Sequence, residues 1–193
     1  ADVDALHYLG LISLERGDAG RALDLIGRAL RQRPNDAILN NNLANARRRL
    51  GHRPAARTGY RRALAVEPGL ADGWGNLGAL LGELQQPVTS ILAHRRAIAI
   101  DRDVAELHFA LLLAVGPEKG GSALRRALAL DPTLAQGWVI AGDHRRALAL
   151  RPDLPEALAA AGAVRLAAGR PREALSLLDR APGHDLLHGG NAG

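Results

Sequence analysis

Small and apolar residues recur along the chain with a period of 34. Three sets of positions keep this spacing over three copies: Ala29, Ala63 and Ala97; Leu9, Leu43 and Leu77; Gly10, Ala44 and Gly78. A period of this length is typical of repeat proteins, in which each repeat folds as one small supersecondary unit. The pattern therefore predicts stacked, similar repeats rather than one globular core.

Each repeat is predicted to contain two helices. In the first repeat, apolar residues at helical spacing indicate one helix over about 4–17 and a second over about 19–33. Gly17-Asp18 separates them, because Gly commonly ends a helix and Asp commonly caps the next one. Pro34 closes the second helix, since proline cannot continue it.

Residue size predicts how these helices pack. Neighbouring helices can approach closely where their side chains are small, which is expected at Gly10, Ala22 and Ala29. Larger apolar residues should fill the space between the helices: Leu9, Ile26 and Leu30.

The period breaks in the second half of the chain. Only 30 residues separate Ala97 from Ala127, and the stretch 114–122 is expected to be a loop. Ala147 follows Ala127 after 20 residues, so 14 residues of a full repeat are missing near Gly142-Asp143. Two interpretations remain open: two half-helices are fused into one, or the sequence is spliced across residues that it lacks.

We therefore expect a solenoid over residues 1–182, built from six repeats. They are 3–36, 37–70, 71–104, a shortened 105–134, an interrupted 135–154, and 155–182. Residues 183–193 form a tail or the start of a further repeat. No polar capping helix is predicted there, so we expect the solenoid to continue, or to join another domain, in a longer protein.

The repeats resemble those of the tetratricopeptide repeat (TPR) family. That family's repeat has a large residue, Leu and a small residue in its first helix, then small–large–small and a closing Pro in its second. The N-terminal repeats match at Leu6, Leu9, Gly10, Ala22, Ile26, Ala29 and Pro34; at Asn40, Leu43, Ala44, Ala56, Tyr60, Ala63 and Pro68; and at Trp74, Leu77, Gly78, Ser90, His94 and Ala97. Arg102 replaces the third Pro. The resemblance implies an all-α, right-handed solenoid whose first helices line a concave groove.

In such a groove, the resemblance points to the sixth and ninth residues of each repeat. An Asn at the sixth place resembles the asparagine ladder of the O-linked N-acetylglucosamine transferases, whose amides grip an extended polypeptide backbone. An amide suits this task because it offers donors and an acceptor without charge. In the second repeat, two Arg residues at the end of the first helix can also face the groove. The predicted partner-binding residues are Asn41, Asn42, Asn45, Arg48, Arg49 and Asn76.

A chaperone-type carboxylate clamp is not expected. That type of clamp uses a basic residue early in the first helix, where this chain has Asp4, Ile38 and Asp72.

Composition excludes several other kinds of site. The chain is 47% hydrophobic and 3% aromatic, and it has no Cys for disulfides or Cys-ligated metals. No sequence motif of a hydrolase, metalloprotease, P-loop or dinucleotide site occurs, so we expect no catalysis and no cofactor. His184 and His188 lack a third ligand and are not expected to bind a metal. Trp74 and Trp138 stand at helix starts and are expected in the core.

The net charge of +5 comes mainly from Arg. Arg pairs recur late in the second helices: Arg61-Arg62, Arg95-Arg96, Arg125-Arg126 and Arg145-Arg146. We interpret them as a solvated face, with Arg stems covering apolar surface. No aromatic residues interleave with them to stack bases, so nucleic acid is not an expected partner. No apolar stretch approaches the roughly 18 residues of a membrane span.

The sequence thus favours a cytoplasmic protein-interaction scaffold that binds a peptide or a partner segment in its groove. The alternative is a non-catalytic, substrate-binding arm of a larger bacterial enzyme, because the opening repeats resemble those that precede glycosyltransferase, methyltransferase or sulfotransferase domains. A catalytic domain downstream in the full reading frame would decide for the alternative. Self-association through uncapped ends is a third hypothesis.

Overall fold

The computed structural model describes residues 2–180, and over this range the chain forms twelve α-helices and no strand. The first seven are α1 (Val3–Glu15), α2 (Ala19–Gln32), α3 (Ala37–Arg49), α4 (Arg53–Val66), α5 (Ala71–Glu83), α6 (Pro87–Ile100) and α7 (Ala105–Val115). The other five are α8 (Gly121–Leu130), α9 (Ala135–Ile140), α10 (His144–Leu150), α11 (Pro155–Ala167) and α12 (Pro171–Leu178). The prediction of an all-α repeat solenoid is confirmed.

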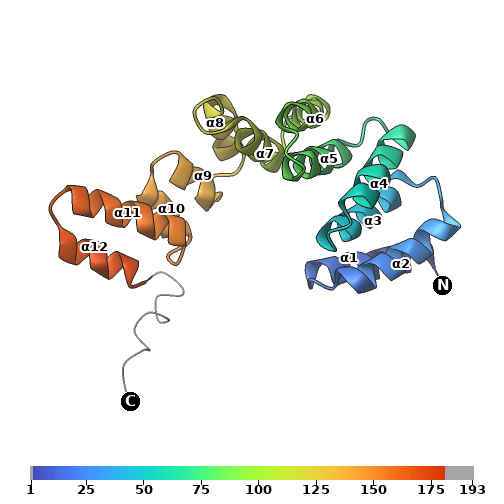
Figure 1. Cartoon of the computed structure of the whole chain (residues 1–193), viewed down its shortest axis with the longest axis horizontal. Coiled ribbons are helices and arrows are strands. Elements are labelled where there is room, and N and C mark those ends of the chain that lie inside the picture. Colours follow the sequence, from blue (N-terminus) through green and yellow to red (C-terminus); the bar gives the residue numbers. More distant parts are fainter. Residues whose placement is uncertain (1, 181–193) are drawn as a thin grey trace, which may run out of the picture. The chain divides into compact units, whose positions relative to one another are not determined.

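The helices group into two compact units, with the boundary between Gly116 and Pro117. In the N-terminal unit, α1 packs on α2, α3 on α4, and α5 on α6, each pair as a hairpin (Figure 1). The first helices also contact one another in the order α1, α3, α5, α7, so they form one layer of the unit. In the C-terminal unit, α9 packs on α10, and α11 packs on α12.

Aspartate side chains begin four of the helices. Asp2, Asp18, Asp36 and Asp143 each accept a hydrogen bond of 2.9 to 3.0 Å from a backbone N–H group in the first turn. Each of these bonds satisfies a donor that has no partner within the helix. The predicted turn between the first two helices is confirmed, because Gly17 takes a φ of +81° directly before Asp18.

The close approach of the two helices in a hairpin depends on small residues, as predicted. A Cβ atom added to Gly10 would lie only 2.5 Å from Cγ1 of the buried Ile26. Alanines at similar contacts are fully buried: Ala22, Ala29, Ala44, Ala56, Ala63 and Ala97. Larger side chains at these places would overpack the hairpins and push their helices apart.

One core prediction is wrong. Leu9 was expected between the helices, but it is 48% exposed, whereas Leu43 and Leu77 at the same place in the next repeats are buried. Leu43 belongs to a core cluster that includes Ile26 of the preceding repeat. Leu9 lacks such a partner because no described helix precedes α1.

A second recurring contact ties the second to fifth repeats to the loops before them. The side chain at the fourth place of a repeat donates a hydrogen bond to the carbonyl oxygen six residues earlier. The pairs are Asn40 to Pro34 (3.2 Å), Trp74 to Pro68 (3.0 Å), His108 to Arg102 (2.9 Å) and Trp138 to Pro132 (2.8 Å). Both Trp rings also pack against hydrophobic core clusters, as predicted.

The interrupted repeat forms two short helices, not the single fused helix that one interpretation of the sequence required. Gly142 takes a φ of +81° between α9 and α10, and Asp143 caps α10. This geometry repeats the turn at Gly17 and Asp18. The other interpretation, that residues are absent from the sequence at this junction, stays a prediction.

Gln85 gives a test of the turn geometry. It occupies the turn position that Gly17 and Gly51 hold in the first two repeats, with a φ of +58°. A side chain in this left-handed region costs about 1–2 kcal/mol. We therefore expect Gln85→Gly to raise the free energy of unfolding by about 1 kcal/mol and the Tm by roughly 2–4 °C. Thermal melting followed by circular dichroism measures this.

The matched control for this prediction is Gln86→Gly. Gln86 has a φ of −112°, where glycine gives no relief. An equal rise in Tm for both variants would contradict the proposed strain at Gln85.

Candidate functional site

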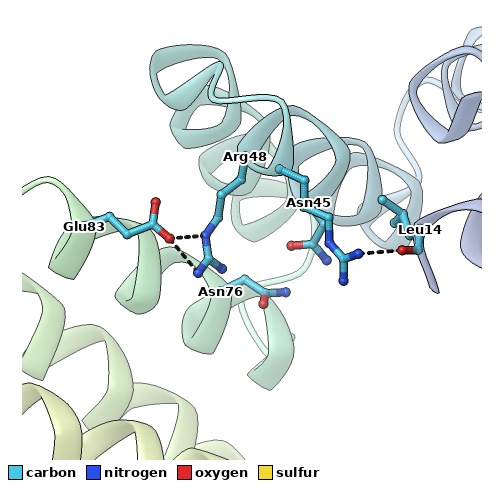
Figure 2. Close-up of a pocket in the computed structure, with 6 residues that line it drawn as sticks. Leu14, Asn45, Arg48, Asn76 and Glu83 are labelled. Atoms are coloured by element: carbon cyan, nitrogen blue, oxygen red, sulfur yellow. Dashed lines mark hydrogen bonds and ion pairs between the residues drawn. The ribbon is translucent and has the colours of Figure 1, made fainter. Parts of the chain in front are cut away.

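A hollow of about 390 Å³ opens along α1, α3 and α5 of the N-terminal unit (Figure 2). We call it the polar groove, because five of its six lining residues are polar: Leu14, Asn45, Arg48, Arg49, Asn76 and Glu83. The first helices of three consecutive repeats supply these residues.

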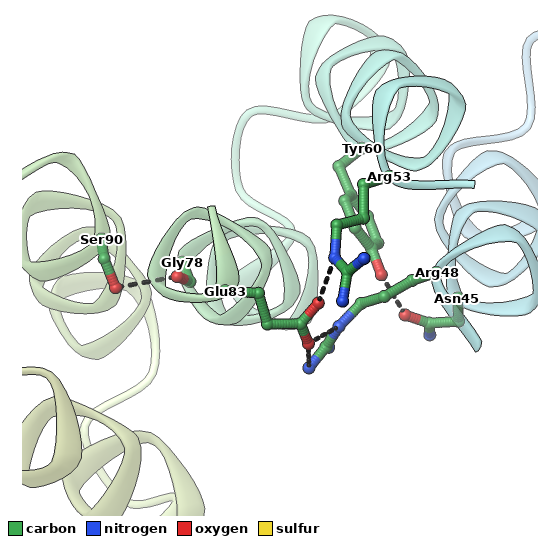
Figure 3. Close-up of polar contacts among 7 residues, drawn as sticks. All are labelled: Asn45, Arg48, Arg53, Tyr60, Gly78, Glu83 and Ser90. Carbon is green, nitrogen blue, oxygen red and sulfur yellow. Dashed lines mark hydrogen bonds and ion pairs between the residues drawn. The ribbon is translucent and has the colours of Figure 1, made fainter. Parts of the chain in front are cut away.

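Contacts between repeats anchor both arginines of the polar groove. Arg48 donates through Nε to Glu83 Oε1 at 2.8 Å, and Arg53 Nε approaches the other oxygen of Glu83 at 3.4 Å (Figure 3). Arg49 instead donates to the backbone carbonyl of Leu14. Because that carbonyl carries no charge, Arg49 keeps an unbalanced positive charge in the polar groove.

Two asparagines present opposite hydrogen-bonding atoms to the polar groove. The Tyr60 hydroxyl donates to Asn45 Oδ1 at 2.6 Å, which leaves Asn45 Nδ2 as a donor (Figure 3). Burial raises the pKa of the Tyr60 phenol, so this hydroxyl keeps its proton. Asn76 Nδ2 donates to Asn41 Oδ1 at 3.2 Å, which leaves Asn76 Oδ1 as an acceptor. Neither remaining atom has a partner within residues 2–180.

Asn76 is the end of a chain of four side chains that crosses α5, α3 and α1. Beyond Asn76, Asn41 Nδ2 donates to Asn42 Oδ1 at 3.3 Å, and Asn42 Nδ2 lies 2.8 Å from His7 Nε2. An amide nitrogen can only donate, so His7 Nε2 accepts and the imidazole proton sits on Nδ1. This order of donors and acceptors fixes which atom of Asn76 remains free.

The structure brings four of the six predicted binding residues together in the polar groove: Asn45, Arg48, Arg49 and Asn76. Asn41 and Asn42 lie outside its lining, and their amides bond to neighbouring repeats. Direct contact of these two with a partner stays a prediction. Sequence reasoning missed Glu83, which Arg48 reaches from 35 positions away, a spacing that a 34-residue pattern does not reveal.

A second hollow, of about 490 Å³, adjoins the polar groove at Asn76 and extends to α7. We call it the acidic pocket, because its only charged lining residues are Asp72 and Glu106. It is lined by Asp72, Gly75, Asn76, Ala79, His94, Val104, Glu106, Leu107 and Ala110.

Sequence reasoning also missed His94 as a functional candidate. The ring is 3% exposed, and its Nδ1 has no hydrogen-bond partner in the described part of the chain. A sequence signal existed, because His94 stands where the first two repeats have Ile26 and Tyr60. Burial lowers the pKa of the imidazole, so it is neutral at neutral pH.

No family model matches the sequence, and no curated protein matches it. Solved structures do match. TTC0263, a thermophilic TPR protein in Thermus thermophilus, is 22% identical, with 96% of this chain and 95% of that chain covered and a TM-score of 0.64. YrrB, a TPR protein with an unusual peptide-binding site, is 18% identical, with 83% and 94% covered and a TM-score of 0.62.

The chain has the TPR fold. The first TPR of Spaghetti (RPAP3), bound to an HSP90 peptide, also matches it at 19% identity, with 58% of this chain and 90% of that chain covered and a TM-score of 0.55. The helix hairpins described above are thus those of the TPR fold.

The structure also describes surfaces outside the two hollows. All eight residues of the four Arg pairs are exposed. Among residues 2–180, no helix has the length and apolarity to cross a membrane, and no group of three or more His, Cys, Asp or Glu residues could hold a metal ion. His184 and His188 lie outside the described residues.

The buried imidazole of His94 predicts a loss of stability in acid. Its folded pKa is depressed, so below the ordinary value of about 6.5 the unfolded chain binds a proton that the folded chain does not. The contribution of His94 to stability is therefore complete above about pH 6.5 and falls as the pH drops toward the folded pKa. We expect His94→Ile, which copies Ile26, to reduce the fall in Tm between roughly pH 7.5 and 5.

Thermal melts over this pH range measure the effect. His52→Gln is the control, since it removes an exposed imidazole and leaves the buried one in place. If His94→Ile and the unchanged protein lose the same Tm in acid, His94 is not the titrating group.

Proposed function

We propose that this chain is a non-catalytic interaction scaffold that binds an extended peptide segment in the polar groove. The observation that carries the proposal is the pairing of Asn45 Nδ2, a free donor, with Asn76 Oδ1, a free acceptor, in one hollow. A backbone peptide group presents one acceptor and one donor, so the two amides are complementary to it.

The charge of the polar groove adds a preference to this backbone recognition. Glu83 balances Arg48, while Arg49 bonds only to the Leu14 carbonyl. An Arg guanidinium binds carboxylates with good geometry. We therefore expect the bound segment to place an acidic side chain or its C-terminal carboxylate beside Arg49.

Two TPR proteins with a similar fold support a peptide as the partner. YrrB is a TPR protein with an unusual peptide-binding site, and the Spaghetti (RPAP3) TPR is bound to an HSP90 peptide. Because they are 18% and 19% identical to this chain, they support only that this fold can hold a peptide. Which peptide binds here depends on the residues of the polar groove.

Peptide selection followed by mutation tests the proposal. A phage-displayed library of random dodecapeptides is selected against the full chain, and a selected peptide is titrated by fluorescence polarisation. We expect Asn45→Ala with Asn76→Ala to weaken binding about 10-fold or more, because two hydrogen bonds of about 1 kcal/mol each are lost.

Asn35→Ala, in the exposed loop between α2 and α3, is the control and should bind as the unchanged chain does. The circular dichroism spectrum of the double variant should match that of the unchanged chain, which would show that its helices are kept. Unchanged affinity in the double variant, or a library that yields no binder, would count against the polar groove as the site.

The finer predictions from the sequence belong to this proposal. An arm of a larger bacterial enzyme could use the same groove to hold a protein substrate, and the reading frame beyond Gly193 tests that alternative. In a peptide-gripping ladder, Asn76 fits the role that the resemblance to O-linked N-acetylglucosamine transferases implies, while Asn42 already bonds to His7. A cytoplasmic location also stays a prediction.

Self-association is a second candidate function, favoured by the exposed apolar face of α1. This face carries Tyr8, Leu9 and Ile12, although the residues equivalent to Leu9 are buried in later repeats. We expect a second copy of the chain to cover it. Light scattering should then show a mass that rises with concentration, and Leu9→Glu should lower that mass. A monomer mass at all concentrations would exclude this function.

A further inference from the structure

Side chains of neighbouring first helices meet at a spacing that is one residue longer than the repeat period. The fifth residue of one repeat meets the sixth residue of the next, 35 positions later: His7 meets Asn42, and Asn41 meets Asn76. At the third junction, the equivalent residues are Gly75 and Ala110, which have no polar side chains. The acidic pocket opens at this junction, where no polar side-chain pair joins α5 to α7 and Leu107 lies against Gly75.

Two unpaired carboxylates face this opening. Asp72 lies in the first turn of α5 and Glu106 in the first turn of α7, and neither makes a hydrogen bond or an ion pair with any described residue. Asp4, the equivalent of Asp72 in the first repeat, is paired with Arg33 at 2.8 Å. In the third repeat the place of Arg33 is taken by Asp101, so Asp72 lacks that cation.

His94 is the independent sign that the pocket takes a ligand. It lines the pocket from α6, is almost fully buried, and has an Nδ1 without a partner. Nδ1 itself is closed off from solvent, but Nε2 of the same ring also has no partner among the described residues, so a donor entering the pocket can bond to it. The neutral ring adds no positive charge to oppose a cation.

We propose that the acidic pocket binds the cationic side chain, lysine or arginine, of the segment held in the polar groove. Asp72 and Glu106 supply the negative charge, and His94 and Asn76 supply neutral polar contacts around the ammonium or guanidinium group. The proposal rests on the proposed peptide binding. It adds that the bound segment carries a basic side chain as well as the acidic group expected beside Arg49. Asn76 lines both hollows, so an acidic group beside Arg49 and a basic group in the acidic pocket lie on its two sides.

Small probes test the acidic pocket without a selected peptide. N-acetyl-lysine methylamide is titrated into the full chain labelled with ¹⁵N, and its neutral relative N-acetyl-norleucine methylamide serves as the reference. We expect the lysine probe to shift the amide signals of Gly75 and Ala110 with a dissociation constant on the order of millimolar. Asp72→Asn with Glu106→Gln should weaken this binding about 10-fold or more, and the shifts should shrink in high salt.

Glu67→Gln, at an exposed acid outside the pocket, is the control and should leave the titration unchanged. A second variant, Ala110→Asn, adds a polar side chain to the pocket lining and should shrink the shifts by filling part of the pocket. Gly75 is left unchanged, because a Cβ atom there would lie 2.9 Å from Leu107 Cδ2. Equal shifts with the norleucine probe, or lysine binding that survives the loss of both carboxylates, would overturn the proposal.

The same variants separate this proposal from the one on which it rests. A selected peptide that loses affinity in the Asn45→Ala and Asn76→Ala protein, but not in the Asp72→Asn and Glu106→Gln protein, leaves the polar groove standing and rejects the acidic pocket. A peptide that also loses affinity when its lysine or arginine is replaced by norleucine supports both.

Discussion

The first three repeats depend on the close approach of their two helices, which only small residues permit. At Gly10 and Gly78 an added Cβ would lie within 3 Å of the facing side chain, Ile26 in one case and His94 in the other. The large residue of the second helix at this contact therefore extends between the two helices to the layer of first helices. When that residue is Tyr60 its hydroxyl reaches Asn45, and when it is His94 its ring lines the acidic pocket. A core position thus decides the chemistry of the surface above it.

The second constraint is the offset between neighbouring first helices. Side chains meet across repeats at 35 positions, one more than the period, and this holds for Asn41 with Asn76 and for Arg48 with Glu83. Such contacts use both amide atoms of Asn41 and of Asn42, but only Nδ2 of Asn76, whose Oδ1 has no partner among the described residues. The groove atoms available to a partner are therefore those that the junctions between repeats have not used.

These two constraints explain what the sequence could and could not predict. The period, the helix hairpins, the turn at Gly17 and the buried alanines follow from residue size and helix propensity, which are local properties. Asn42 and Asn76 look equivalent in the repeat pattern, but only Asn76 lines the polar groove, because their partners across the junctions differ. Leu9 was misplaced for the same reason, since its burial requires a neighbour that the pattern of one repeat does not contain. The acidic pocket is lined by Gly75 and Ala110, where the first two junctions have polar side chains, and these two residues belong to no motif.

The chain of amides from His7 to Asn76 shows how far such a junction can act. Each amide in the chain donates toward α1, so Asn76 is left with an oxygen and not a nitrogen at the polar groove. His7 Nε2 accepts at the end of this chain, because an amide nitrogen can only donate. A proton on Nε2 would place two donors face to face, and the amides could restore the chain only by reversing, which would present the Asn76 nitrogen to the groove. The hydrogen-bonding character of the proposed site is therefore linked to His7, a residue two repeats away that does not line the polar groove.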